Sequence, residues 1–299
     1  MPIKKPKVAI CFFGHLRTFE KCLPNIYKHL ISMYDCDIFM HTWDVYNHNT
    51  KTWHTNFKNS NKKVNQDKII KVFGITPEQI QIEHQEIYST GKFISRGREW
   101  ALQSPMSMYH SIKNVNELRE KYQRKHHIKY DIIVFIRPDI LLFKDLNLDK
   151  YINDELNTNE KNVYFSGHGV DRDMYGMNYI ETADLLFFGK PKTMSAFCSD
   201  IKVPVKDGDV IDYYPDGFLI DNILHAKLKP VFIGSYQYGK ALKIKRYPQI
   251  KLNRSNIFSF HIRKHGVYLY LLRVLPPVIN INTNLFGWFD VVISVGKTD

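Results

Sequence analysis

Short apolar runs alternate with segments of helical periodicity along most of this sequence, and that alternation restricts the possible folds more than any other feature. The runs 7–13 and 132–136 consist mostly of β-branched, aromatic and other apolar residues. Between them, apolar side chains in 104–124 recur every three or four positions, which predicts an amphipathic helix. Buried strands that alternate with helices form parallel sheets covered on both faces. We therefore predict an α/β fold with a Rossmann-like, mostly parallel sheet flanked by helices.

The same patterns predict the other elements of the first 234 residues. Further strands are expected at 37–41, 80–87, 162–166, 185–188 and 230–233. Further helices are expected at about 18–33 and 191–201, and from the Pro215-Asp216 pair onward. The segments 45–66 and 200–214 are predicted to be loops. We predict the simplest domain organisation, which is one domain over 1–234 and a basic C-terminal extension over 235–299 that packs on it.

The net charge of +12 is concentrated toward the C-terminus. No acidic residue occurs between Asp221 and Asp290, whereas eleven Lys and Arg residues do. Such a block favours an anionic partner, such as a nucleotide diphosphate, an anionic lipid surface or a nucleic acid. The alternative is a basic surface that simply faces water.

The cysteine spacing and the apolar runs restrict the compartment. The four cysteines have neither metal-binding nor disulfide-like spacing, and no apolar run approaches the ~20 residues that a membrane-spanning helix needs. The run 8–13 is too short for a signal peptide. We therefore expect a cytoplasmic protein, with at most a peripheral contact to the inner face of the membrane. The apolar segment 267–275 is the candidate for that contact, and a core helix is the alternative.

Polar residues follow three of the predicted strands, at the edge where α/β sheets bind ligands. They are Gly14 and Arg17, His41 and Trp43, and Arg137 and Asp139. Glycine permits close approach of the backbone to a ligand, and arginine can hold a phosphate or a carboxylate. His41 and Trp43 can stack on a base or a sugar, although an aromatic pair at a strand end is also common in cores. Asp139 is suitably placed for a divalent ion that bridges phosphates.

These motifs, in this order, are similar to those of one enzyme family. The segment 104–143 contains a Ser111-Ile112 helix, Tyr130-Asp131, an apolar strand and Arg137-Pro138-Asp139. It resembles bacterial and viral glycosyltransferases of the GT-A type, which build capsule, lipopolysaccharide and other surface glycans. Further matches occur in the family's order at Gly14-His15-Leu16-Arg17, Asp37-Ile38-Phe39-Met40-His41-Thr42-Trp43, Ala183-Asp184 and Pro215-Asp216. Together the matches span roughly residues 7–234.

The resemblance implies a GT-A-like domain that transfers a sugar from a nucleotide-sugar donor to a glycan or lipid-linked acceptor. Its donor site would comprise Gly14, Arg17, His41, Trp43, Arg137 and Asp139. Arg137 and Asp139 stand where related enzymes carry an Asp-x-Asp metal motif, so Mn²⁺ or Mg²⁺ is expected at Asp139, with His261 as a late ligand. Arg137 replaces one acid of that motif, which removes a metal ligand and adds a fixed positive charge, so a cation such as Arg137 is the alternative to a metal ion. The literal Asp-x-Asp at 171–173 follows a Gly-rich turn and is expected to be a loop.

Transfer with inversion at the anomeric carbon requires a carboxylate base for the acceptor hydroxyl. The candidates are Asp184, directly before an apolar strand, and Asp216, at a helix start where capping is the alternative role. Arg137 is the third predicted catalytic residue.

The sequence is also compatible with two other functions. A transferase of another nucleotide-activated group, such as a phosphoramidate or phosphate ester, would use the same scaffold. A nucleic-acid-binding protein would explain the aromatic residues interleaved with the C-terminal cations, but the sequence has no RNA-binding signature or helix-turn-helix.

Overall fold

The computed structural model describes residues 5–47, 62–152, 160–171, 179–181, 183–213, 215–237 and 240–245, and three strands at 257–264, 267–274 and 290–295. The chain divides into two compact units, Met1–Tyr247 and Pro248–Asp299. The predicted domain end at residue 234 lies within strand β12 (Lys229–Gln237). Strand β13 (Leu242–Ile244) then pairs with β7 (Ile140–Leu142), so the chain up to residue 245 packs with the first unit.

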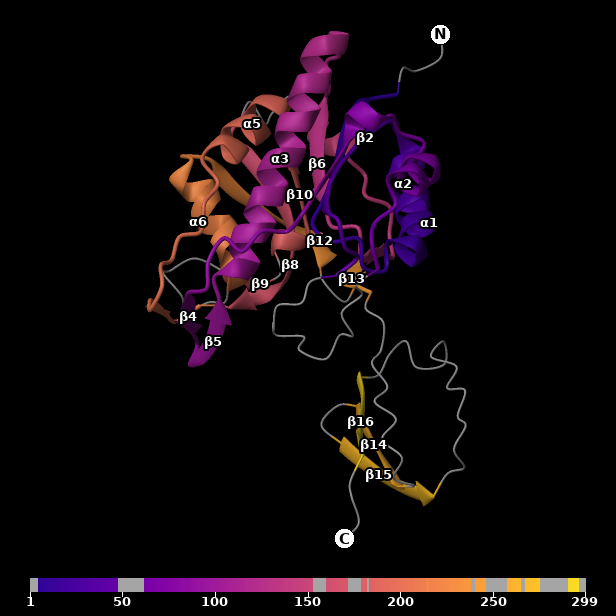
Figure 1. The fold of residues 1–299 in the computed structure, drawn as a ribbon, viewed down its shortest axis with the longest axis vertical. Helices are drawn as coiled ribbons and strands as arrows, with labels where there is room; N and C mark the ends of the chain where they lie inside the picture. Colours follow the sequence, from indigo (N-terminus) through magenta and orange to yellow (C-terminus); the bar gives the residue numbers. More distant parts are fainter. Residues whose placement is uncertain are drawn as a thin grey trace. The chain divides into compact units, whose positions relative to one another are not determined.

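A mixed sheet forms the centre of the first unit (Figure 1). Its main strands are β1 (Lys7–Phe13), β2 (Asp35–Trp43), β3 (Ile80–Glu83), β6 (Ile132–Ile136), β8 (Asn162–Asp171), β10 (Leu186–Gly189) and β12, in the order β12-β8-β10-β6-β1-β2-β3. Neighbouring strands are parallel except at β10, which is antiparallel to β6 and β8. A short strand β9 (Tyr179–Glu181) pairs with β8. The predicted mostly parallel α/β sheet is therefore confirmed.

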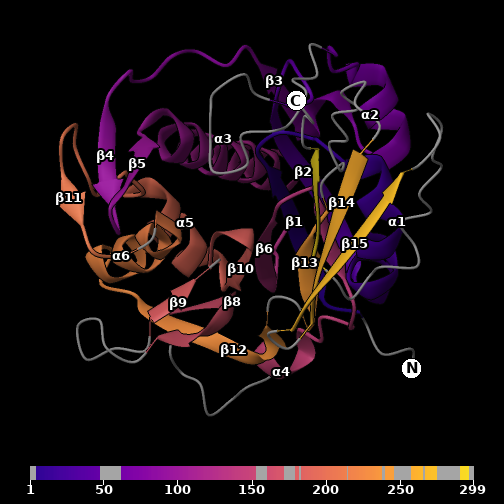
Figure 2. The same ribbon diagram turned by 90° about the horizontal axis from the view of Figure 1, so that it is seen from below.

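Helices cover both faces of this sheet (Figures 1 and 2). One face carries α1 (Phe19–His29) and α2 (Gln66–Phe73), and the other carries α3 (Gln103–His126), α5 (Pro191–Ser199) and α6 (Phe218–His225). Successive side chains of a strand point to opposite faces. In β1, accordingly, Val8, Ile10 and Phe12 pack with the first helix group and Ala9, Cys11 and Phe13 with the second. Burial on both faces explains why β1 reads as a continuous apolar run.

Several short elements occur where the sequence predicts loops or a single longer element. The predicted helix 18–33 is α1 followed by a 3₁₀ turn at Ile31–Met33. A hairpin of β4 (Lys92–Ser95) and β5 (Arg98–Ala101) pairs with β11 (Val210–Ile211), which lies within the predicted loop 200–214. The short helix α4 (Asp149–Ile152) follows β7.

The strand order reverses next to β1. The chain proceeds from β1 to β2 and β3 on one side, and the next strand of the sheet, β6, lies on the other side of β1. In open α/β sheets such a reversal leaves a crevice at the carboxyl ends of the two strands, and ligands bind there. A ligand site is therefore expected at the residues that follow Phe13 and Ile136.

The second unit contains a three-stranded antiparallel sheet. Strand β14 (Ile257–Lys264) lies between β15 (Val267–Val274) and β16 (Asp290–Val295). The expectation of a helix at 267–275 is wrong, because this segment is β15. Its apolar residues form no helical stripe, and β-branched and aromatic residues suit a strand. In the part of the chain that the structure describes, each helix is too short or too polar to span a membrane.

Candidate functional site

A cavity of about 120 Å³ lies at the carboxyl ends of β1 and β6. Its lining includes five of the predicted site residues: Gly14, Arg17, Trp43, Arg137 and Asp184. Gly14 directly follows β1 and has a φ of +87°, a conformation that favours glycine. The predicted convergence of strand ends therefore holds for Gly14, Arg17, Trp43 and Arg137. Asp184 reaches the same cavity because the antiparallel strand β10 begins at this edge of the sheet.

Two arginines share one buried carboxylate beside this cavity. Arg137 donates from Nε and Nη2 to the two oxygens of Asp139, each at 3.1 Å. Arg17 donates from Nη1 to Asp139 Oδ2 at 3.3 Å. Asp139 is fully buried, whereas both arginine side chains keep a small exposed fraction. The carboxylate thus fixes two guanidinium groups at the cavity wall.

This geometry gives Asp139 a different role from the predicted one. Both of its oxygens accept guanidinium hydrogen bonds, and the residue does not line the cavity. A divalent cation at Asp139 would have to replace two fixed positive charges, so the surrounding residues do not fit a metal ion there. Asp139 positions arginines instead. The sequence shows only the Arg137–Asp139 spacing, and Arg17 lies 122 positions away.

The basic segment of the chain reaches this cluster through its backbone. The Lys245 amide donates to the carbonyl oxygen of Asp139 at 2.7 Å. The Thr18 hydroxyl in turn donates to the carbonyl oxygen of Lys245. These two hydrogen bonds join the residue after β13 to Asp139 and to Thr18, which directly precedes α1.

Asp184 is the carboxyl group next to the arginines on the cavity side. It lies in a 3₁₀ turn at Ala183–Leu185, directly before β10. Its Oδ2 is 3.9 Å from Nη1 of Arg137. Burial raises the pKa of Asp184, while the charges of Arg137 and Arg17 oppose that rise. A carboxyl group with a raised pKa beside two cations has the properties of a general base.

His41 and Trp43 both lie in β2, but only Trp43 lines the cavity, whereas His41 supports the site from within the core. The His41 ring is fully buried and leaves no face for a base or sugar, and its Nδ1 contacts Ser111 Oγ at 2.8 Å. Ser111 Oγ also accepts from the Gly14 amide at 2.8 Å, so His41 and Ser111 together hold the turn after β1. Burial lowers the pKa of His41 to about 4. Trp43 is almost completely buried and stacks on His110, with 5.6 Å between ring centroids.

A chain of polar side chains that the sequence patterns did not predict lines the same cavity. His15 Nε2 contacts Gln85 Oε1 at 3.1 Å, and the Gln85 amide donates to Ser107 Oγ at 2.9 Å. The Gln103 amide donates to the same hydroxyl at 3.0 Å. Gln103 and Ser107 are four residues apart on α3, so their helical spacing was a usable signal. The contacts of His15 and Gln85 depend on tertiary structure.

Three predicted positions lie partly or wholly outside the described residues. Asp216 is in a 3₁₀ turn at Pro215–Gly217, before α6, and its side chain is not described. His261 is in β14 of the second unit, and its side chain is likewise not described. Asp171 ends β8, and residues 172–173 are outside the described part of the chain.

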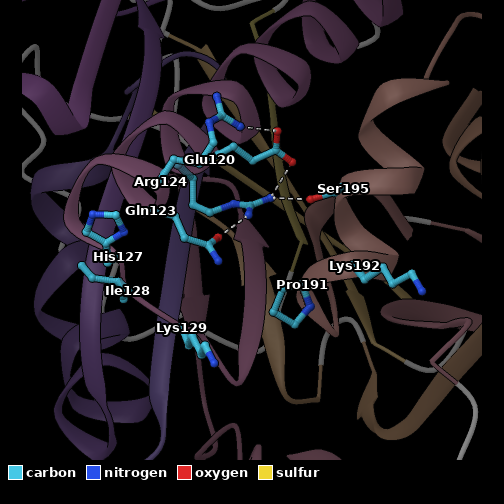
Figure 3. Close-up of a pocket in the computed structure, with 10 residues that line it drawn as sticks. Glu120, Gln123, Arg124, His127, Ile128, Lys129, Pro191, Lys192 and Ser195 are labelled. Atoms are coloured by element: carbon cyan, nitrogen blue, oxygen red, sulfur yellow. Dashed lines mark hydrogen bonds and ion pairs between the residues drawn. The ribbon is translucent and has the colours of Figure 1, made fainter.

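A second, more open cavity of about 850 Å³ lies between the C-terminal half of α3 and the start of α5 (Figure 3). Its lining is rich in basic residues: Arg119, Arg124, His127, Lys129 and Lys192. Arg119 is buried and donates to Gln123 at 2.8 Å and to Ser195 of α5 at 3.0 Å, which ties the two helices together. None of the predicted site residues lies there.

Comparison with known proteins identifies a family. The profile of the family described as Domain of unknown function (DUF7796) matches residues 3–183, more than half of the chain. The match includes Gly14, both arginines and Asp139, and it ends one position before Asp184. No curated protein matches the sequence.

Proposed function

The chain belongs to the DUF7796 family, and we propose that it is a glycosyltransferase that moves a sugar from a nucleotide-sugar donor to an acceptor hydroxyl. One observation carries the proposal: Arg17 and Arg137 are fixed by buried Asp139 at the cavity where the strand order reverses. Paired guanidinium groups on a rigid support suit a diphosphate, because each presents a planar fork of donors. The motif order that resembles GT-A-type enzymes supports the same reaction.

In the proposed reaction, Asp184 acts on the acceptor hydroxyl, and Arg17 and Arg137 act on the leaving group. The acceptor hydroxyl attacks the anomeric carbon, and Asp184 takes the hydroxyl proton. The bond between the anomeric carbon and the diphosphate oxygen breaks, and the electron pair leaves with the nucleoside diphosphate. Arg17 and Arg137 stabilise the negative charge that develops on this leaving group. Asp184 suits its role because a raised pKa brings a carboxylate closer to the working pH of a base.

The arginine pair takes the electrostatic role that a divalent cation would otherwise have at the diphosphate. Two guanidinium groups already occupy the oxygens of Asp139. Donor binding is therefore proposed not to require Mn²⁺ or Mg²⁺ at this position. This replaces the expected metal role of Asp139.

The cavity size limits which part of a donor it holds. Pockets that enclose a drug-sized ligand measure about 300–1,000 Å³, and this cavity measures about 120 Å³. It therefore suits one small group, such as the diphosphate, with the rest of the donor at its mouth. A glycan or lipid-linked acceptor is proposed to approach from the same side, and the C-terminal cations would favour an anionic membrane surface.

A ligand panel tests this proposal on the full chain. Thermal unfolding is followed with UDP-, GDP-, CMP- and dTDP-sugars, each with and without Mn²⁺. A ligand at 100 times its dissociation constant adds ~2.7 kcal/mol to stability, so one donor class should raise the melting temperature without needing Mn²⁺. Stabilisation only by another nucleotide-activated group would assign a different transferase. Stabilisation only by RNA or DNA would contradict the proposal.

A further inference from the structure

Three potential metal ligands converge beside α3, apart from the arginine cluster. They are His41 of β2, Glu83 of β3 and His110 of α3, whose ligand atoms all lie within 4.8 Å of one another. Glu83 Oε2 is 3.2 Å from Nε2 of His41 and 2.8 Å from Nε2 of His110. Ligand atoms around a tetrahedral zinc ion, each ~2.0 Å from the metal, are about 3.3 Å apart. The two separations from Glu83, 3.2 and 2.8 Å, are thus close to this spacing, and the third lies within 4.8 Å.

Asn114 adds a fourth group, one helical turn after His110. Its amide nitrogen is 2.6 Å from His110 Nε2, 3.3 Å from His41 Nε2 and 3.4 Å from each oxygen of Glu83. Four polar groups from two strands and one helix therefore face a common point.

With the Asn114 amide in this orientation, a single proton on His110 Nε2 cannot satisfy both of its neighbours. If His110 Nε2 carries a proton, it donates to Glu83, but two donors then face each other at the Asn114 NH₂ group. If it carries no proton, it accepts from Asn114, but its lone pair then faces the lone pairs of the Glu83 carboxylate. A half-turn of the amide would bring the Asn114 oxygen beside the two carboxylate oxygens. A cation at the centre removes each conflict, because both imidazoles, the carboxylate and the rotated amide then direct lone pairs at it.

The surroundings hold the two imidazoles as they hold metal ligands elsewhere. His41 Nδ1 contacts Ser111 Oγ at 2.8 Å, which leaves Nε2 directed at the cluster. Trp43 stacks on the His110 ring and fixes its plane. Outer partners of this kind orient ligating histidines in metalloproteins.

We propose that His41, Glu83 and His110, with the amide oxygen of Asn114, bind one divalent transition-metal ion of the zinc class. Imidazole ligands favour zinc and its neighbours, whereas Mg²⁺ and Ca²⁺ prefer oxygen ligands alone. Glu83 and His110 are each about one third exposed, so an ion reaches the site from solvent. This inference is independent of the proposed function, since it concerns metal binding and not transfer.

The test measures metal binding directly on the full chain, freed of any purification tag and of metal by a chelator. Zn²⁺ is titrated by calorimetry, and Co²⁺ is added as a spectroscopic probe. We expect one high-affinity equivalent of Zn²⁺ and visible absorption bands typical of four-coordinate Co²⁺. His110→Gln and Glu83→Gln should each weaken Zn²⁺ binding at least 10-fold, because each removes a ligand.

His126→Gln is the matched control. It lies on the same helix, and its Nε2 also meets a carboxylate, Glu78, at 3.1 Å. This variant should bind Zn²⁺ as the wild type does. Asn114→Asp adds a negatively charged ligand and should bind Zn²⁺ at least as tightly as the wild type. This variant keeps the proposal testable if another variant fails to fold. Absence of a high-affinity equivalent, or unchanged affinity in both ligand variants, would show a hydrogen-bonded network instead.

Discussion

Asp139 is the residue on which the arginine pair depends. Asparagine in its place would keep the size of the side chain but leave Arg17 and Arg137 without their shared negative charge. Removing one partner of a buried ion pair costs about 3 kcal/mol, so Asp139→Asn should lower the free energy of unfolding by about that amount in urea titrations. The control Asp145→Asn alters an exposed carboxylate that bonds His29, and should change it by less than about 0.5 kcal/mol. Equal stabilities for the two variants would refute the positioning role of Asp139.

Asp184 gives a prediction about pH. Below the ordinary carboxyl pKa of ~3.9, Asp184 is protonated in both the folded and the unfolded chain. As pH rises, the unfolded chain loses this proton first, because burial raises the pKa in the folded state. Stability contributed by the neutral carboxyl is therefore lost as pH rises through the folded pKa.

Asp184→Asn removes this loss, since an amide does not ionise. The free energy of unfolding of the variant, minus that of the wild type, should therefore be larger at pH 7.5 than at pH 4.5, as measured by urea unfolding at both values. A constant difference at the two pH values would show that burial does not raise this pKa.

At the scale of elements, helix α3 connects the turn after β1 to the core. Ser111 is fully buried and accepts from the Gly14 amide while contacting His41. Ser111→Ala leaves these groups without that partner, at a cost of about 2 kcal/mol, and should weaken ligand binding at the cavity. Ser199→Ala, at the exposed end of α5, is the control and should cost less than about 0.5 kcal/mol. Chemical denaturation of both variants checks this, and equal losses would contradict it.

The sequence predicts some elements far better than others, for physical reasons. The bounds of β1 and β6 follow directly from it, because each strand is buried on both faces and ends at a residue unsuited to a strand, Gly14 or Arg137 before Pro138. The sequence does not predict the hairpin of β4 and β5, because each strand has only four residues of mixed polarity and β4 is stabilised by pairing with β11. Helix α2 is not predicted either, although the Asn65 cap and Gly74 in the left-handed conformation were usable signals.

For the candidate site, too, the sequence predicts some features and not others. Strand ends bring Gly14, Arg17 and Arg137 to one cavity, as the sequence pattern predicts. The arrival of Asp184 depends on the antiparallel direction of β10, which the sequence does not show. The sequence does not show which partner each charge takes, because Asp139 bonds an arginine 122 positions away. Nor does it show that His41 is enclosed by α3.

At the scale of the whole molecule, the cations after Asp221 should govern binding to surfaces. Eleven positive charges without an acidic residue attract anionic lipid by about 1 kcal/mol for each charge near the surface. The full chain should therefore sediment with vesicles that contain anionic lipid at low salt and be released at high salt, because salt screens such contacts. Vesicles of neutral lipid serve as the control. Failure to bind anionic vesicles at low salt would exclude a membrane role for this block.

The proposed function requires that Arg17 and Arg137 bind the donor diphosphate at the carboxyl ends of β1 and β6. Calorimetry would give the dissociation constant of the most stabilising nucleotide sugar for wild type, Arg17→Lys, Arg137→Lys and Arg124→Lys. Lysine keeps the charge near Asp139 but lacks the planar fork of donors. The first two variants should bind about 10-fold more weakly, which corresponds to ~1.4 kcal/mol, whereas Arg124→Lys in the second cavity should match the wild type. Unchanged affinity in both site variants, or a loss confined to Arg124→Lys, would contradict this binding role.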